Sequence, residues 1–258
     1  MKIACVQMDI ALGEPVKNFE VVEKNIMAAA NECVDVIVLP EMWNTGYALE
    51  QLDRLADEGG QKTRELLSRL AKKYQVNIVG GSVATKNNGK FLNTMYVVDR
   101  TGNIVAEYDK AHLFKLMNEH LYMNEGKKTN VFELDGVTCG GVICYDLRFP
   151  EWIRLHTLIG AKIMFIPAQW PKKRIDHCQV LLQARAIENQ CYIVAVNRVG
   201  KDPNNEFNGH SMVIAPWGEL ILSNQTEAGI YYANLDLAEV DRVRKEIPVY
   251  QDRRTDLY

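Results

Sequence analysis

Short apolar strands alternate with amphipathic helices along most of this 258-residue chain. Apolar side chains recur at helical spacing over 16–33 and over 61–74, and β-branched runs lie before and after these two segments. Turn signals at 88–89, 101–102 and 135–136 join neighbouring strands. A mixed sheet with helices on its outer faces accommodates this order of elements, so we expect a layered α/β protein.

The expected elements can be placed by residue number. Strands are predicted over 3–10, 34–40, 76–83, 91–99, 103–109, 162–167 and 191–197, helices over 16–33, 61–74 and 175–190, and a hairpin over 210–223. No linker rich in proline, glycine or serine, no charge block and no internal repeat divides the chain. Residues 1–258 are therefore predicted to form a single domain.

The composition argues against several classes of protein. With 47% hydrophobic and 24% charged residues, the chain has the make-up of an ordinary soluble globular protein. A chain of this length buries roughly 70–75% of its unfolded surface, so its core needs no disulfide or metal. The net charge of −3 gives no general attraction for nucleic acid or for an anionic membrane. No apolar stretch approaches the roughly 20 residues that span a bilayer.

The cysteines indicate the compartment. The chain has six cysteines, which form neither a CxxC pair nor a cysteine–histidine ligand pattern. The N-terminus enters a strand directly and shows no signal peptide. Reduced thiols in the cytoplasm are therefore predicted, with no metal site.

Cys144 ends a buried run of small and β-branched residues over 138–144, and the sequence turns polar immediately afterwards. Because a helix is expected to begin near Pro150, the thiol should lie on a sharp turn beside a helix N-terminus. We expect that position to leave the sulfur accessible and to favour its thiolate. The alternative is a core position, which is where most free cysteines lie.

Two charged residues occupy matching places at the ends of other strands. Glu41 follows the strand that closes at Pro40, and Lys110 follows the strand over 103–109. The carboxyl ends of strands are where open α/β sheets usually bind ligands. A carboxylate, an ammonium and a thiol are therefore expected to meet there. Taken singly, Glu41 would cap a helix or pair with a lysine, and Lys110 would be solvated.

The segments around these three residues are LPEMWNTGY, EYDKAHLF and GGVICYDLRFPEW. They resemble, in order and spacing, the three signature regions of the nitrilase, or carbon–nitrogen hydrolase, superfamily. The resemblance runs from KIACVQMDI near the start to the RKEIPVYQDRRTDLY tail, and it is greatest to the ω-amidase (2-oxoglutaramate amidase) branch. It implies the four-layer α-β-β-α sandwich of that superfamily.

The resemblance also implies a cysteine-dependent amide hydrolysis without a cofactor. Cys144 would be the nucleophile that forms a thioester, and Glu41 would be the general base. Lys110 and the backbone N–H of Tyr145 would stabilise the oxyanion. Glu119 stands where the family often has a second glutamate, which would support catalysis; the alternative is a solvated loop carboxylate.

The implied substrates are small ω-monoamides of dicarboxylic acids, such as 2-oxoglutaramate, together with water. A cation opposite the amide would bind the distal carboxylate. Arg148 is a candidate, although it could instead brace the turn by pairing with Asp146 or Glu151. Further candidates for substrate binding are Tyr47, Trp170 and Arg174.

Other functions remain compatible with the same residues. The substrate could be a nitrile, an N-carbamoyl compound or an amide like deaminated glutathione, and a non-catalytic binding protein is a third possibility. A buried charged triad without a catalytic role would be costly, which argues against that third possibility. Members of the superfamily commonly pair, so a homodimer or larger homo-oligomer is expected. It would form around the helix near 150–160, with Trp152 and Leu155, and the tail ending at Tyr258.

Overall fold

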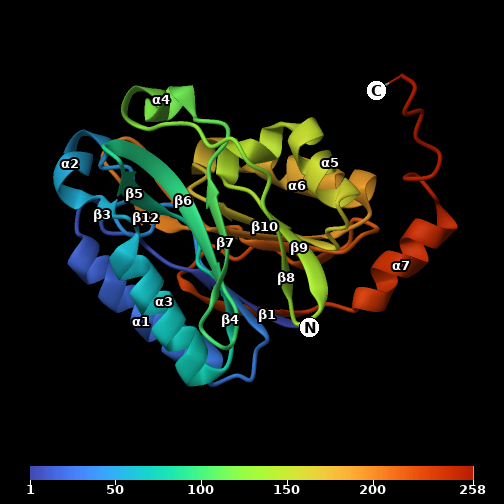
Figure 1. Cartoon of the computed structure of the whole chain (residues 1–258), viewed down its shortest axis with the longest axis horizontal. Coiled ribbons are helices and arrows are strands. Elements are labelled where there is room, and N and C mark those ends of the chain that lie inside the picture. Colours follow the sequence, from blue (N-terminus) through green and yellow to red (C-terminus); the bar gives the residue numbers. More distant parts are fainter. Residues whose placement is uncertain (258) are drawn as a thin grey trace.

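The computed structural model describes residues 1–257, so Tyr258 lies outside the described part of the chain. Two β-sheets pack face to face, and pairs of helices cover the outer face of each (Figure 1). The layers therefore follow the order α-β-β-α, and the predicted four-layer sandwich is confirmed. None of the described helices is both long and apolar enough to cross a membrane.

The first sheet contains eight strands in the order β16-β1-β2-β4-β6-β5-β3, with β7 paired to β6. Strands β1, β2 and β4 run parallel, whereas β5, β6 and β7 form antiparallel hairpins. The bounds are β1 (Lys2–Gln7), β2 (Val36–Val38), β3 (Asp57–Glu58), β4 (Asn77–Val79), β5 (Val83–Asn87), β6 (Lys90–Val98), β7 (Ile104–Asp109) and β16 (Gly229–Asn234).

The second sheet contains six strands in the order β15-β14-β11-β10-β9-β8. Its central strands β9, β10 and β11 run parallel, so their carboxyl ends lie at one edge. The bounds are β8 (Val131–Leu134), β9 (Val137–Gly141), β10 (Ile163–Ala168), β11 (Tyr192–Asn197), β14 (Met212–Ile214) and β15 (Leu220–Leu222); a separate ribbon pairs β12 (Val199–Lys201) with β13 (Glu206–Asn208).

Helices α1 (Pro15–Ala30) and α3 (Gln61–Tyr74) pack on the first sheet, and α5 (Pro150–Leu158) and α6 (Ile175–Asn189) pack on the second. Helix α7 (Leu237–Glu246) precedes a C-terminal tail that extends away from the body of the molecule (Figure 1). The short helical segments are α2 (Leu52–Leu55), α4 (Glu119–Tyr122), η1 (Leu49–Gln51), η2 (Lys115–Met117), η3 (Cys144–Arg148) and η4 (Lys172–Arg174).

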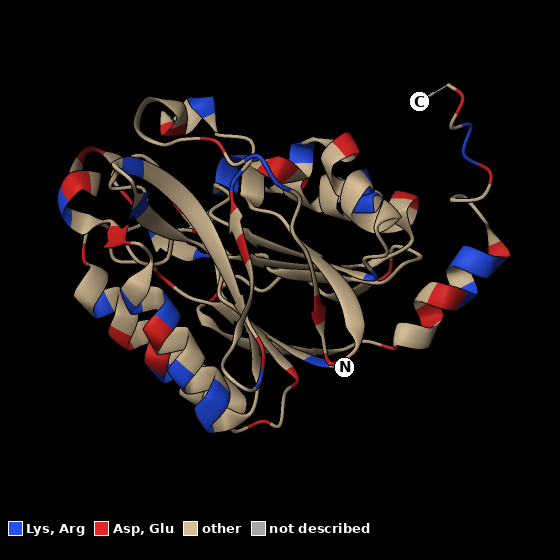
Figure 2. Ribbon diagram, in the orientation of Figure 1, with Lys and Arg blue, Asp and Glu red and all other residues tan. Residues whose placement is uncertain are grey.

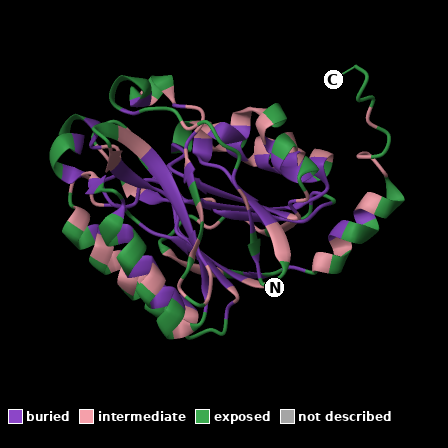
Figure 3. Cartoon of the chain, viewed as in Figure 1, coloured by how far each residue is buried: buried purple, intermediate pink, exposed green. Residues whose placement is uncertain are grey.

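Apolar side chains fill the space between the two sheets and the space between each sheet and its helices. Figure 2 shows the charged residues gathered mainly on the helices and loops, while the strands are largely uncharged. Figure 3 shows buried strands and helices with exposed outer faces. The few charged side chains inside this core therefore stand out, because an ionised group is buried only where it has partners.

Gly80 and Gly81 interrupt the single strand that was predicted over 76–83, and the prediction was wrong at this point. Gly81 has a φ of +61°, and a Cβ at this position would lie 2.0 Å from the carbonyl oxygen of Pro40. The chain can turn here only because glycine has no side chain. This close approach holds the segment immediately before Glu41.

Candidate active site

The structure brings the three predicted strand-end residues together. Glu41 follows β2, Lys110 follows β7, and Cys144 lies three residues beyond β9. All three side chains are buried, with Glu41 and Lys110 fully removed from solvent and Cys144 only 6% exposed. The site therefore lies where strand ends from both sheets converge.

Lys110 is the centre of a buried charge network. Its Nζ lies 2.8 Å from Glu41 Oε1 and 2.8 Å from Glu119 Oε2. Glu119 is itself fully buried and also accepts a hydrogen bond from the backbone N–H of Phe114 at 2.7 Å. Solvated positions for Lys110 and Glu119, the alternatives considered from the sequence, are wrong.

The carboxylate of Glu41 receives hydrogen bonds from both sheets. Tyr47 Oη donates to Oε1 at 2.8 Å, and Asn93 Nδ2 donates to the same oxygen at 3.0 Å. The backbone N–H of Gln169 donates to Oε2 at 2.8 Å. The thiol of Cys144 lies near enough to this carboxylate for the charge of Glu41 to act on it. Glu41 is thus held in one orientation with the thiol beside it.

Burial and the neighbouring opposite charges shift the pKa values of Glu41, Lys110 and Glu119 in opposite directions. Burial opposes ionisation of Glu41, but the charge and hydrogen bond of Lys110 outweigh it, so the pKa of Glu41 is lowered. Burial likewise opposes ionisation of Lys110, but Glu119 and Glu41 raise its pKa. Burial, reinforced by the charge of Glu41, raises the pKa of Glu119 despite Lys110.

The expectation of an accessible Cys144 thiolate is wrong. Burial and the negative charge of Glu41 raise the pKa of this thiol well above its usual value, although Lys110 opposes the shift. The helix that begins at Pro150 is separated from the cysteine by the short 3₁₀ helix η3. Cys144 also has a φ of +43°, a left-handed conformation that costs an L-residue roughly 1–2 kcal/mol.

A cavity of about 10 Å³ lies against Cys144, which is space for about one water molecule. The predicted substrate-binding residues Tyr47, Arg148 and Trp170 all line it. Two of these side chains already have polar partners, because Tyr47 donates to Glu41 and Trp170 Nε1 donates to the carbonyl of Arg174 at 2.7 Å. Tyr145, whose backbone N–H was predicted to face the oxyanion, lies in the first turn of η3 beside the cavity.

Arg148 and Arg174 line the same cavity and lie near enough that the charge of Arg148 contributes, after burial, to a lowered pKa for Arg174. The guanidinium of Arg148 lies 4.7 Å from the ring centroid of Trp170, and that of Arg174 lies 5.5 Å from the ring of Phe114. Neither guanidinium has a carboxylate partner within residues 1–257. The alternative in which Arg148 braces the turn through Asp146 or Glu151 is therefore wrong.

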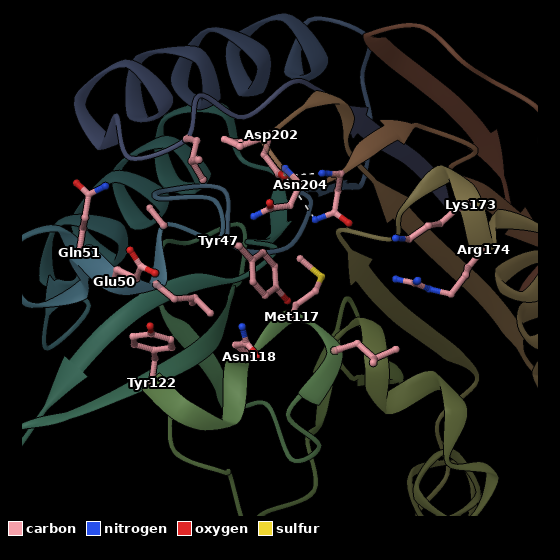
Figure 4. Close-up of a pocket in the computed structure, with 16 residues that line it drawn as sticks. Tyr47, Glu50, Gln51, Met117, Asn118, Tyr122, Lys173, Arg174, Asp202 and Asn204 are labelled. Atoms are coloured by element: carbon pink, nitrogen blue, oxygen red, sulfur yellow. Dashed lines mark hydrogen bonds between the residues drawn. The ribbon is translucent and has the colours of Figure 1, made fainter.

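A larger depression of about 680 Å³, which we call the vestibule, opens next to this cavity (Figure 4). Tyr47, Met117 and Arg174 line both spaces. In Figure 4, Tyr47 and Met117 lie near the centre of the vestibule, and Lys173 and Arg174 reach in from one side. The vestibule therefore lies directly beside the cavity that Cys144 lines.

Asn93 and Gln169 belong to the site but were missed in the sequence analysis. Asn93 lies in the middle of β6, where its Nδ2 bridges Glu41 and Glu119 at 3.0 and 2.9 Å. Gln169 contributes through its backbone, and no side-chain pattern reveals such a contact. Its place directly after β10 was a usable signal, because three other strand ends already carried site residues.

Known proteins resemble this chain in sequence and in fold. The carbon–nitrogen hydrolase family matches residues 2–245. The chain is 52% identical to the 2-oxoglutaramate amidase of Bacillus subtilis (strain 168), over 99% of this chain and 98% of that protein. It is 38% identical to omega-amidase YafV of Escherichia coli (strain K12), over 84% of each chain.

The crystal structure of XC1258 from Xanthomonas campestris, a CN-hydrolase superfamily protein with an arsenic adduct in the active site, has the same fold. Its TM-score is 0.93 at 28% sequence identity, over 99% of this chain and 97% of that chain. The chain described here belongs to the carbon–nitrogen hydrolase family. It is an amidohydrolase that acts on linear amides.

Proposed function

We propose that this protein hydrolyses the terminal amide of short ω-monoamides of dicarboxylic acids, such as 2-oxoglutaramate, and releases ammonia. The observation that carries the proposal is the pair of guanidinium groups beside Cys144 that have no carboxylate partner within residues 1–257. Two such cations beside the thiol favour a substrate that brings its own negative charge. The printed names of the relatives from B. subtilis and E. coli support the same substrate class.

In the first half of the reaction, Glu41 accepts the proton of the Cys144 thiol as the sulfur attacks the amide carbonyl. The oxygen of the tetrahedral intermediate faces Lys110 and the backbone N–H of Tyr145. Each donor of this kind stabilises a transition state by roughly 3–4 kcal/mol in comparable acyl transfers. Glu41 then gives its proton to the nitrogen, the C–N bond breaks, ammonia leaves and a thioester remains on Cys144.

In the second half, Glu41 accepts a proton from a water molecule as the water attacks the thioester. The carboxylic acid leaves and the proton returns to the Cys144 sulfur, so the cycle closes with no change in the enzyme. Glu119 supports both halves, because it holds the Lys110 ammonium together with Glu41. The lowered pKa of Glu41 keeps it ready to act as the base near neutral pH.

Arg148 and Arg174 bind the distal carboxylate in this proposal, while Tyr47 and Trp170 shape the walls between that carboxylate and the scissile amide. Trp170 supports Arg148 by stacking, and its indole N–H is already engaged. The hydroxyl of Tyr47 orients Glu41. The hydrogen-bond donors that remain for the substrate carboxylate are therefore the guanidinium N–H groups of the two arginines.

A substrate panel tests the proposal. Arg148→Gln and Arg174→Gln should each lower kcat/KM for succinamate by about 10- to 100-fold, because a charged hydrogen bond contributes about 1.5–3 kcal/mol. The same variants should change kcat/KM for the uncharged amide butyramide by less than about 3-fold. Released ammonia is the readout, Cys144→Ala provides the inactive reference, and Lys173→Gln, on the vestibule beside Arg174, is the matched control.

Two outcomes would contradict the proposal. One is a wild-type chain that hydrolyses nitriles, N-carbamoyl compounds or uncharged amides faster than any ω-monoamide. The other is an equal loss on succinamate and butyramide in the arginine variants, which would assign the guanidinium groups to folding rather than to the carboxylate.

We also propose that the chain is a single domain that acts as a homodimer or larger homo-oligomer in the cytoplasm. All six cysteines are unpaired, which suits a reducing compartment. Exposed apolar residues on the second sheet's helices suit an interface between copies of the chain: Leu155, Leu158, Val180 and Ile187.

A further inference from the structure

Asp146 lies two residues after Cys144 and is fully buried. Its Oδ1 accepts a hydrogen bond from the backbone N–H of His112 at 2.9 Å and lies 2.7 Å from His112 Nδ1. Its Oδ2 accepts from Tyr108 Oη at 2.7 Å and from the backbone N–H of Ile143 at 3.0 Å. Because a carboxylate only accepts hydrogen bonds, the His112 ring donates through Nδ1. Four donors therefore converge on one side chain.

These donors belong to the two segments that carry the reacting groups. Tyr108 and His112 stand two residues before and two residues after Lys110, and Ile143 directly precedes Cys144. We propose that Asp146 is a positioning residue that fixes the oxyanion-binding lysine relative to the nucleophile. This inference rests on the function proposed above, in which Lys110 stabilises the oxyanion formed by attack of Cys144.

The backbone conformation of Cys144 explains why a residue such as Asp146 is needed to hold the turn. Cys144 is held at a φ of +43°, and a strained residue of this kind persists only where its surroundings determine it. Asp146 closes the turn from both sides, because its carboxylate accepts from Ile143 N–H while its own N–H donates to the Ile143 carbonyl at 3.0 Å. Without the carboxylate, the turn is free to relax and to displace the sulfur and the Tyr145 N–H.

The hydroxyl of Tyr108 extends the same network to helix α5. It accepts hydrogen bonds from Trp152 Nε1 at 3.0 Å and from the backbone N–H of Ala111 at 3.2 Å, and it donates to Asp146. The carboxylate thus joins β7, the nucleophile turn and α5. A misplacement of about 1 Å between reacting groups can lower a rate by about 100-fold, so the rate should be sensitive to this junction.

The test compares Asp146→Asn with Asp57→Asn. Asp57 is also a buried carboxylate that accepts several hydrogen bonds, from Lys62 N–H and from the N–H and hydroxyl of Thr63 at the start of α3, and it lies outside the site. Rapid-quench intact-mass measurements with succinamate give the rate constant of acylation from the initial rate of adduct formation, and circular dichroism before mixing gives the fraction of chains that is folded. Unfolding in urea is measured in parallel.

We expect both variants to unfold at lower urea concentration, and both to be fully folded before mixing. Only Asp146→Asn should acylate about 100-fold more slowly than the wild type. A reduced folded fraction with an unchanged acylation rate constant per folded chain would show a merely structural role and overturn the inference. An equal slowing in Asp57→Asn would overturn it as well.

Tyr108→Phe provides a second variant if Asp146→Asn does not fold. It removes one donor to Asp146 Oδ2 and keeps the aromatic ring, so it should slow acylation while the chain stays fully folded. An unchanged acylation rate constant would overturn the inference. Failure of the proposed function is a separate result, because it would appear in the wild-type chain as a lack of ammonia release from every ω-monoamide.

Discussion

The protonation state of three side chains decides how the nucleophile is activated. The pKa of Cys144 is raised by burial and by Glu41, while the pKa of Glu41 is lowered by Lys110 and its other donors. The resting pair is therefore a neutral thiol beside a carboxylate, and not a thiolate beside an acid. In the proposed mechanism, the proton therefore moves to Glu41 only as the sulfur attacks, when Lys110 can stabilise the charge passed to the carbonyl oxygen.

This protonation state makes a prediction for labelling with N-ethylmaleimide. Near pH 7 the exposed Cys33 should react first and Cys144 slowly, because only the thiolate reacts. The rate at Cys144 should rise by about tenfold per pH unit and continue rising through pH 9, since its pKa lies well above that value. Peptide mass spectrometry measures both rates. A plateau at Cys144 below pH 8 would show that the resting thiol is ionised.

At the residue scale, strand-end positions were sufficient to bring together Glu41, Lys110 and Cys144. Glu119 could be predicted only from the family resemblance, because it begins the short helix α4 and follows no strand. The charge state of Cys144 could not be predicted in the same way. It depends on burial by parts of the chain that lie far away in sequence, and so does the recruitment of the Gln169 backbone N–H. The role of each residue stays a prediction that the variants above test.

At the scale of elements, helices were easier to predict than strands. Helix α3 has the predicted bounds of 61–74, because its buried leucines recur every three or four residues. Strand β2 is shorter than the predicted 34–40, and β16, α7 and the β12–β13 ribbon were not predicted at all. A strand exists only where a partner lies beside it, and β1 pairs with β16, more than 220 residues away. The local sequence pattern of a strand therefore cannot predict which distant segment pairs with it.

The turn at Gly81, between β4 and β5, packs against Pro40 and so holds the segment that carries Glu41. The substitution Gly81→Ala tests whether this contact matters for activity. The new Cβ would overlap the Pro40 carbonyl, so we expect a loss of unfolding free energy of roughly 2–4 kcal/mol and a fall in kcat. Gly89→Ala is the matched control, because Gly89 also has a positive φ but nothing lies within 4 Å of its added Cβ. It should cost about 1 kcal/mol and leave kcat unchanged. Urea unfolding and ammonia release measure both; equal kcat values in the two variants would refute the link.

At the scale of the whole molecule, the exposed apolar face of α5 and α6 predicts the assembly. Val180 on α6 is 67% exposed, and Leu155 on α5 is 45% exposed. If this face joins two copies, Val180→Asp should raise the dimer dissociation constant by about 30-fold or more, which corresponds to the roughly 2 kcal/mol of an interface hot spot. Val16→Asp, at a 76% exposed valine on α1, should have no effect. Sedimentation velocity over a concentration series is the measurement, and a wild-type chain that stays monomeric would refute the assembly.

The burial of Cys144 has a further consequence for the durability of the enzyme. Oxidants attack cysteine as the thiolate and convert it to sulfenic acid, and then irreversibly to sulfinic and sulfonic acids. Cys144 rests as a buried thiol with a raised pKa, so little of it is in the form that peroxides attack. In the proposed mechanism, the neutral thiol that requires Glu41 as a base is therefore also protected from oxidation. The nucleophile stays chemically inert between turnovers, and we expect the resting enzyme to survive peroxide concentrations that inactivate enzymes with a free active-site thiolate.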